Sequence, residues 1–181
     1  MKPIFIIGYM GSGKTTFGRA LARRLNWDFI DLDFFITQRF HKSVAQIFES
    51  VGEAGFRKIE KEMLREVGEF ENVVIACGGG TPCHDNNMEW MNSRGLTVFM
   101  DTDEDCLIRR LLTGGSKRPL VAGKTESELR DFVSNHLAER LQFYSLAHTA
   151  LPGAFLESRR DIDRTVDLFL VTTEKFLKFA P

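Results

Sequence analysis

The segment GYMGSGKTT, residues 8–16, most constrains what this 181-residue chain can fold into. An apolar run at residues 4–7 precedes the segment, and a helical pattern at residues 14–25 follows it. Four residues match the phosphate-loop pattern G-x-x-x-x-G-K-[ST]: Gly8, Gly13, Lys14 and Thr15. Glycines allow a tight turn in which backbone N–H groups point at phosphate oxygens, and the helix adds its positive end. We therefore expect a strand–loop–helix unit that binds a nucleoside triphosphate, rather than an ordinary glycine-rich turn.

Each polar position of this loop has a predicted task. Lys14 reaches the outer phosphates, and the Thr15 hydroxyl is suited to ligate magnesium. The predicted nucleotide-binding residues of the loop are Gly11, Ser12, Gly13, Lys14, Thr15 and Thr16. The loop does not reveal whether the second substrate is water, a protein or a metabolite.

Short apolar runs alternate with helical patterns along the whole chain. Strands are expected at residues 3–7, 27–32, 73–77, 96–100 and 149–151. Helices are expected at residues 14–25, 44–67 (broken near Gly52 and Gly55), 86–93, 104–112, 126–146 and 160–179. This alternation predicts a single α/β domain, residues 1–181, with a parallel sheet covered on both faces. Ligands of such folds bind beyond the carboxyl ends of the strands.

Composition excludes several classes of partner. The chain has 24 basic and 25 acidic residues and a net charge of −1, so it has no field that would gather nucleic acid or an anionic membrane. No apolar run approaches the length of a membrane span, and we find no signal peptide, so we expect a cytoplasmic protein. Nothing in the sequence resembles an oligomer interface, and we expect a monomer. Cys77, Cys83 and Cys106 are too scattered for a disulfide framework and are expected to be reduced thiols.

Two carboxylates follow the second predicted strand in the stretch FIDLDFF. Asp31 and Asp33 are two residues apart, so on a strand they would share a face. One is suited to hold a magnesium-bound water, and the other to orient a substrate hydroxyl or take its proton. The alternative is that they are helix-capping acids after the end of the strand.

Four further stretches carry cations or glycines that are candidates for a site. Arg57 and Glu60 are three residues apart on a predicted helix, so they can pair. The pair is either a solvated salt bridge or an arginine that Glu60 holds in a cleft, where the arginine would grip a carboxylate. The glycines at residues 78–80 end an apolar strand and allow a ligand to approach the backbone. Arg118 lies in a glycine-flanked stretch typical of a lid. Arg140 lies in a helical pattern, where a solvated arginine is the simpler interpretation.

Together these stretches resemble the shikimate kinase family over residues 3–145. The motifs occur in the family's order: the phosphate loop, Asp31-x-Asp33, Phe56-Arg57-x-x-Glu60, Gly78-Gly79-Gly80, Arg118-Pro119-Leu120, and Arg140 four residues before Tyr144. The resemblance implies a three-layer P-loop kinase fold with a five-stranded parallel sheet, a lid at about residues 112–125 and a substrate-binding insert at about residues 33–62. It also implies transfer of the ATP γ-phosphoryl group to the 3-hydroxyl of shikimate, with Mg²⁺.

The resemblance assigns roles residue by residue. Lys14, Asp33 and Arg118 are the implied catalytic residues, and Arg118 also contacts the nucleotide. Thr15 ligates magnesium and Asp31 supports it through water. The implied shikimate contacts are Asp33, Arg57, Gly79, Gly80 and Arg140.

The sequence departs from the family pattern just before the lid. Leu111-Leu112-Thr113 stands where family members often carry an arginine that stacks on adenine. The candidates for that contact are then Arg109 or Arg110, with Arg159 or Arg160 from the last predicted helix. Three alternatives remain. They are another small-molecule P-loop kinase such as a gluconate kinase, a nucleoside-monophosphate kinase, and a catalytically silent binding or regulatory protein that keeps this fold.

Overall fold

The computed structural model describes the backbone of residues 1–114 and 123–178, and the side chains of residues 1–113 and 123–174. Its strands are β1 (Ile4–Ile7), β2 (Asp28–Asp31), β3 (Val73–Ala76), β4 (Leu96–Asp101) and β5 (Thr149–Pro152). Its helices are α1 (Lys14–Leu25), α2 (Leu32–Phe40), α3 (Val44–Val67), the 3₁₀ turn η1 (Thr81–Cys83), α4 (Asn87–Arg94), α5 (Glu104–Gly114), α6 (Glu126–Tyr144) and α7 (Arg159–Lys178).

The strands form one parallel sheet in the order β2-β3-β1-β4-β5. In the centre of the sheet Ile4 of β1 pairs with Val74 of β3 on one side and with Leu96 of β4 on the other. Every residue of β1 and β3 is buried, as expected for parallel strands that are covered on both faces. The predicted five-stranded parallel sheet is confirmed.

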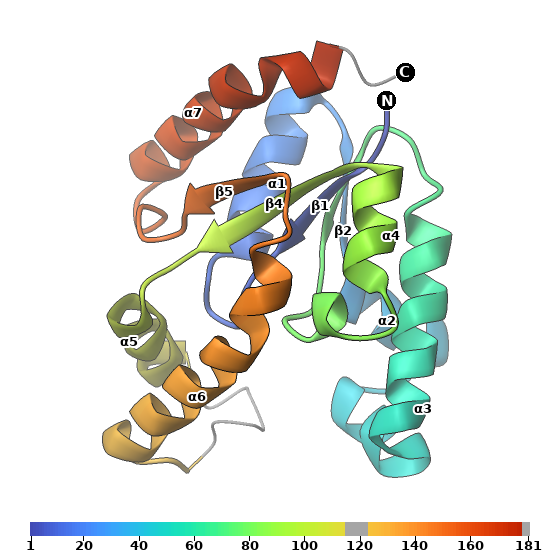
Figure 1. The fold of residues 1–181 in the computed structure, drawn as a ribbon, viewed down its shortest axis with the longest axis vertical. Helices are drawn as coiled ribbons and strands as arrows, with labels where there is room; N and C mark the ends of the chain where they lie inside the picture. Colours follow the sequence, from blue (N-terminus) through green and yellow to red (C-terminus); the bar gives the residue numbers. More distant parts are fainter. Residues whose placement is uncertain (115–122, 179–181) are drawn as a thin grey trace.

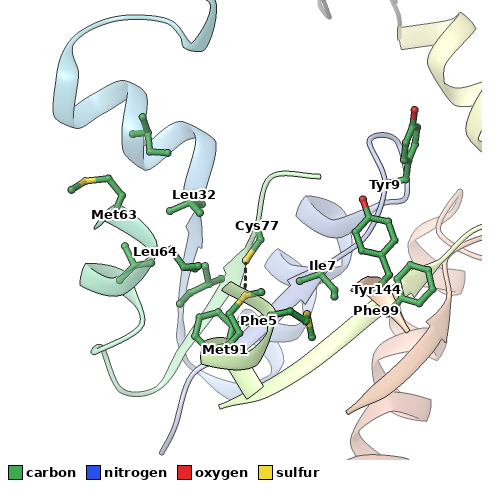
Figure 2. Close-up of a cluster of buried hydrophobic side chains, with 14 of the residues drawn as sticks. Phe5, Ile7, Tyr9, Leu32, Met63, Leu64, Cys77, Met91, Phe99 and Tyr144 are labelled. Atoms are coloured by element: carbon green, nitrogen blue, oxygen red, sulfur yellow. Dashed lines mark hydrogen bonds between the residues drawn. The ribbon is translucent and has the colours of Figure 1, made fainter. Parts of the chain in front are cut away.

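Two hydrophobic clusters sandwich the sheet and make it the middle of three layers (Figure 1). Successive residues of β1 point to opposite faces. Ile4 and Ile6 pack with residues of α1 and α7, whereas Phe5 and Ile7 pack with residues of α2 to α6. Figure 2 shows the cluster that contains Phe5 and Ile7, which lie beside side chains from α3 and α4.

Helix α2 was not predicted, and the reason is local. The Asp31 side chain caps this helix, since its Oδ1 accepts a hydrogen bond from the backbone N–H of Phe34 at 3.2 Å. Asp33 therefore lies in the first turn of α2, and the prediction that the two carboxylates share a strand face is wrong. α2 buries only Leu32 and Ile36, and its phenylalanine side chains lie partly or largely exposed. The apolar residues of this segment therefore do not show a clear helical period.

Helix α3 bends where the sequence indicated a break. Gly52 adopts φ 70° and ψ 180°, which a residue with a side chain rarely adopts, and the helix resumes after it. A capping box formed by Ser43 and Gln46 starts the helix. Gly55, the second predicted breaker, stays helical.

The last helix closes the layer over α1. Phe169 of α7 is fully buried and meets Phe17 of α1 edge-on at 5.6 Å between ring centroids, so it belongs to the core. The side chains of Phe176 and Phe179 lie outside the described residues. Across residues 1–114 and 123–178, every helix is too short or too polar to span a bilayer.

Candidate active site

The loop between β1 and α1 has the backbone of an anion cradle. Gly8, Gly11 and Gly13 all have positive φ values, of 141°, 85° and 94°. A side chain at Gly13 would also be crowded, since a Cβ there would lie 2.4 Å from Cδ1 of Leu156 and that side chain would have to shift. The Lys14 ammonium curls over the loop and donates to the carbonyl oxygens of Gly8 at 2.9 Å and Tyr9 at 2.8 Å. The loop thus carries a fixed cation at the N-terminus of α1, as phosphate binding requires.

A hydroxyl and a carboxylate lie beside the loop. The Thr15 hydroxyl of α1 donates a hydrogen bond to Asp31 Oδ2 at 2.9 Å, and this bond joins α1 to the end of β2. Mg²⁺ prefers oxygen ligands and is commonly held by one or two protein groups together with substrate phosphates. This oxygen pair fits such an ion.

Asp33 points from the first turn of α2 toward the glycines that follow β3. A Cβ on Gly78 would lie 2.9 Å from Asp33 Oδ1. The carboxylate is exposed to the cleft, yet protein atoms surround it on most sides. That desolvation, with the nearby charges of Glu60 and Asp31, raises the pKa of Asp33 to about 6, although Lys14 and Arg57 act in the opposite direction.

A buried glutamate positions Arg57. Glu60 is 1% exposed and accepts hydrogen bonds from Arg57 at 2.8 Å and from the Thr81 hydroxyl at 2.6 Å. The Arg57 guanidinium also lies 5.5 Å from the centroid of the Phe56 ring. A Cβ on Gly80 would lie 2.9 Å from both terminal nitrogens of Arg57, so the guanidinium rests against this glycine.

Arg140 reaches the same glycines from helix α6. A Cβ on Gly79 would lie 3.2 Å from its Nη1, and its Nη2 lies 2.7 Å from Nε2 of His136. The hydroxyl of Tyr144 donates to the Gly79 carbonyl at 2.6 Å, which fixes the loop on which Arg140 rests. The simpler interpretation of Arg140 as a solvated helix arginine is therefore not supported.

These groups line one cleft of about 600 Å³ at the carboxyl edge of the sheet. Figure 1 shows α3 on one side of this edge and α5 and α6 on the other. The cleft contains these predicted site residues: Gly11, Gly13, Lys14, Thr15, Thr16, Asp31, Asp33, Arg57, Gly79, Gly80 and Arg140. Ser12, also in the loop, is fully buried, and Arg118 lies outside the described residues.

The structure separates the candidate adenine-side arginines. Arg110 lines the cleft and donates to the carbonyls of Gly11 at 3.3 Å, Gly153 at 2.9 Å and Ala154 at 3.3 Å. Arg109 instead pairs with Glu157 at 2.6 Å on the surface. Arg159 and Arg160 lie exposed at the start of α7 and do not line the cleft.

Some residues of the site were missed from the sequence. Tyr9, His136 and Thr81 contact the predicted residues directly, but none of them occupies a fixed position of a short motif. Tyr9 is a variable position of the phosphate loop, Thr81 follows the three glycines, and His136 lies on α6. The signal for His136 and Tyr144 was their spacing of four residues on either side of Arg140, which places all three on one helix face.

A phosphate loop at the carboxyl edge of a parallel sheet faces an acid and two arginines across one cleft. This fold and site define a P-loop kinase.

Comparisons with known proteins identify the family. The shikimate kinase family model matches residues 10–168. A shikimate kinase of Phocaeicola vulgatus is 52% identical over 167 residues, which are 92% of this chain and 95% of the relative. The chain belongs to the shikimate kinase family.

Solved structures agree with this assignment. The crystal structure of shikimate kinase from Bacteroides thetaiotaomicron superposes with a TM-score of 0.93 at 48% identity, covering 96% of this chain and 98% of that one. Shikimate kinase from Acinetobacter baumannii, solved in complex with shikimate, has a TM-score of 0.80 at 29% identity, covering 97% and 94%.

Proposed function

We propose that this protein is a shikimate kinase, which transfers the γ-phosphoryl group of ATP to the 3-hydroxyl of shikimate. The products are ADP and shikimate 3-phosphate, in the pathway to chorismate and the aromatic amino acids. One observation carries the proposal beyond family membership. Asp33, Arg57 and Arg140 converge on the glycines at residues 78–80, across one cleft from the phosphate loop.

The phosphate side of the cleft neutralises charge. Backbone N–H groups of the loop and the N-terminus of α1 hold the phosphates, and Lys14 stabilises the transferring group. Its two contacts with loop carbonyls keep its ammonium at the loop. Thr15 would hold Mg²⁺ directly and Asp31 through water, and the ion supplies further neutralisation of phosphate charge.

The acceptor side positions a hydroxylated acid. Arg57 and Arg140 are suited to grip a carboxylate, because planar guanidinium groups match its two oxygens. Gly79 and Gly80 allow the ring of the acceptor to approach the backbone closely. Asp33 accepts a hydrogen bond from the attacking hydroxyl and orients it toward the phosphate.

Asp33 is also the candidate base. With a pKa of about 6 it is mostly ionised at neutral pH, and it is more basic than an ordinary aspartate. A loose transition state needs little activation of the nucleophile, so orientation of the hydroxyl is the larger part of its task.

We propose two further parts of the family pattern. Residues 33–62, which contain nearly all of α2 and the first part of α3, form the acceptor-binding insert. Residues 112–125 form the lid, from which Arg118 meets charge on the nucleotide.

We also propose a cytoplasmic monomer. The free thiols Cys77, Cys83 and Cys106 suit a reducing compartment. Sedimentation equilibrium of the purified chain tests the monomer directly.

The deciding experiment is coupled ADP release with Mg²⁺-ATP and a panel of shikimate, quinate, gluconate and nucleoside monophosphates. Turnover with shikimate alone, lost in Asp33→Asn and weakened in Arg140→Ala, supports the proposal and the acceptor site together. Turnover with a different acceptor would keep the phosphate loop and overturn the assignment of the pocket.

A further inference from the structure

One face of α6 carries a row of polar side chains that point toward the phosphate loop. His136, Arg140 and Tyr144 follow one another at intervals of four residues. Tyr144 stacks on Phe99 at 5.2 Å between ring centroids (Figure 2). Its hydroxyl donates to the Gly79 carbonyl. The remaining member of the row, His136, contacts Arg140 on one side and Tyr9 on the other.

Tyr9 belongs to the phosphate loop and is 1% exposed. Its hydroxyl lies 3.1 Å from Nδ1 of His136, and the two rings meet edge-on at 5.7 Å. Its backbone carbonyl accepts the Lys14 ammonium at 2.8 Å. A single residue therefore contacts both the lysine of the phosphate side and the histidine beside Arg140.

The partners of His136 determine where its proton lies. A guanidinium only donates hydrogen bonds, so Nε2, 2.7 Å from Nη2 of Arg140, must be the unprotonated nitrogen. The proton is then on Nδ1 and is donated to the Tyr9 oxygen. Burial and the charge of Arg140 lower the pKa of His136, and burial raises the pKa of Tyr9 to about 12, so both rings are neutral.

We propose that His136, in its Nδ1-protonated form, is a positioning residue that holds Arg140 in place for the acceptor carboxylate. Tyr9 in turn fixes His136, and this joins the phosphate loop to the acceptor site. The inference rests on the proposed function, in which Arg140 binds the acceptor.

By holding Arg140 in place, His136 should strengthen the binding of the acceptor. An arginine side chain has many rotamers, and one that is already held in its bound geometry loses less freedom when the ligand arrives. Without His136, Arg140 remains charged and near the cleft, but it is no longer aimed. The acceptor KM then rises, while the ATP KM and the melting temperature change little.

The test compares four variants for the KM of shikimate, the KM of ATP, kcat and the melting temperature. His136→Leu removes the acceptor for Arg140 and should raise the shikimate KM about tenfold. His136→Gln offers a carbonyl oxygen in its place and should recover most of this loss. Tyr9→Phe removes only the hydroxyl and should raise the shikimate KM about threefold. Asn135→Leu, at an exposed site on the same helix, is the matched control and should leave all four values unchanged.

A double-mutant cycle with Arg140→Ala separates this inference from the proposed function. If His136 acts through Arg140, then His136→Leu adds no further loss in the Arg140→Ala background. Additive losses, or a shift of the ATP KM equal to that of shikimate, would overturn the positioning role and leave the proposed function standing. A normal shikimate KM in Arg140→Ala would overturn the positioning role of His136 together with the assignment of Arg140 to the acceptor, whereas only the absence of shikimate turnover in the wild type would overturn the proposed activity.

A spectroscopic measurement serves if His136→Leu fails to fold. Long-range ¹H–¹⁵N correlation of the wild-type imidazoles should show His136 protonated at Nδ1. A signal from the Nε2-protonated form would overturn the proposal.

Discussion

Arg57 and Glu60 form an ion pair whose two members have different surroundings. The atoms Nη1 and Oε2 are 2.8 Å apart, the Glu60 side chain is 2% exposed, and the Arg57 side chain is 16% exposed. Glu60 also accepts the Thr81 hydroxyl, so its carboxylate is held at both oxygens. The buried glutamate is the anchor, and the arginine is the part that faces the cleft.

Glu60→Gln should therefore weaken the acceptor site. An amide keeps the shape but loses the negative charge that holds Arg57, and its NH₂ group replaces one of the two oxygens that now accept hydrogen bonds. We expect the shikimate KM to rise about tenfold and the free energy of unfolding to fall by about 2 kcal/mol. Steady-state kinetics and urea titration measure the two effects.

Glu53→Gln is the matched control for this variant. Glu53 also contacts Arg57, at 3.4 Å, but its side chain is 67% exposed. A pair with such exposure contributes little, so we expect a change below about twofold in KM. Equal effects of the two substitutions would contradict the anchoring role of Glu60.

The pKa of Asp33 predicts the acid limb of the pH–rate profile. Its pKa in the free enzyme is about 6, and the ionised form is required to accept the hydrogen bond of the hydroxyl. We expect kcat/KM for shikimate to fall below a pH of about 6. Because Glu60 is one cause of the raised pKa, Glu60→Gln should move this limb to lower pH. A profile that stays flat down to pH 5 would refute the assignment.

The ionised carboxylate of Asp33 should also lower the stability of the folded protein. A pKa raised above the ordinary value of 3.8 means that the folded state binds more protons than the unfolded state between about pH 4 and 6. Wild-type stability therefore falls as the pH rises through this window, whereas Asn does not titrate. Asp33→Asn should be more stable than wild type at pH 8 by about 1 kcal/mol, a modest value because cleft water screens the charge.

Urea titrations at pH 4 and pH 8 check this prediction. The advantage of Asp33→Asn should be smaller at pH 4, and the variant should be inactive at both values. An advantage that does not change with pH would show that the substitution acts through packing instead.

The sequence predicted those parts of the molecule that depend on local pattern. The central strands β1, β3 and β4 were recognised because buried strands appear as apolar runs, and α1 because Gly13 and Lys14 mark its start. Helix α2 escaped recognition since its capping residue, Asp31, also ends a strand. The bond from Thr81 to Glu60 spans 21 residues and that from Tyr9 to His136 spans 127, and no local pattern encodes such contacts.

Gly80→Ala should displace Arg57 without straining the backbone. Gly80 has φ −89°, which any residue adopts, but a Cβ would lie 2.9 Å from both terminal nitrogens of Arg57. We expect the shikimate KM to rise about tenfold, with an unchanged ATP KM and melting temperature. In an Arg57→Ala background the substitution should raise the KM less than in the wild type, and the loss that persists there would come from direct contact of the new Cβ with the acceptor. An equal loss in both backgrounds would contradict a displacement of Arg57.

Arg110→Ala should weaken nucleotide binding, because Arg110 ties the phosphate loop to the segment after β5. Its guanidinium donates to carbonyls of Gly11, Gly153 and Ala154, and loss of these bonds leaves the loop less ordered before ATP arrives. We expect the ATP KM to rise about tenfold while the shikimate KM stays within about twofold. The neighbouring Arg109→Ala is the control, because Arg109 pairs only with groups of the surface and of α5 in the part of the chain that the structure describes. Equal losses in the two variants would show a general dependence on positive charge in α5 and would contradict a specific role for Arg110.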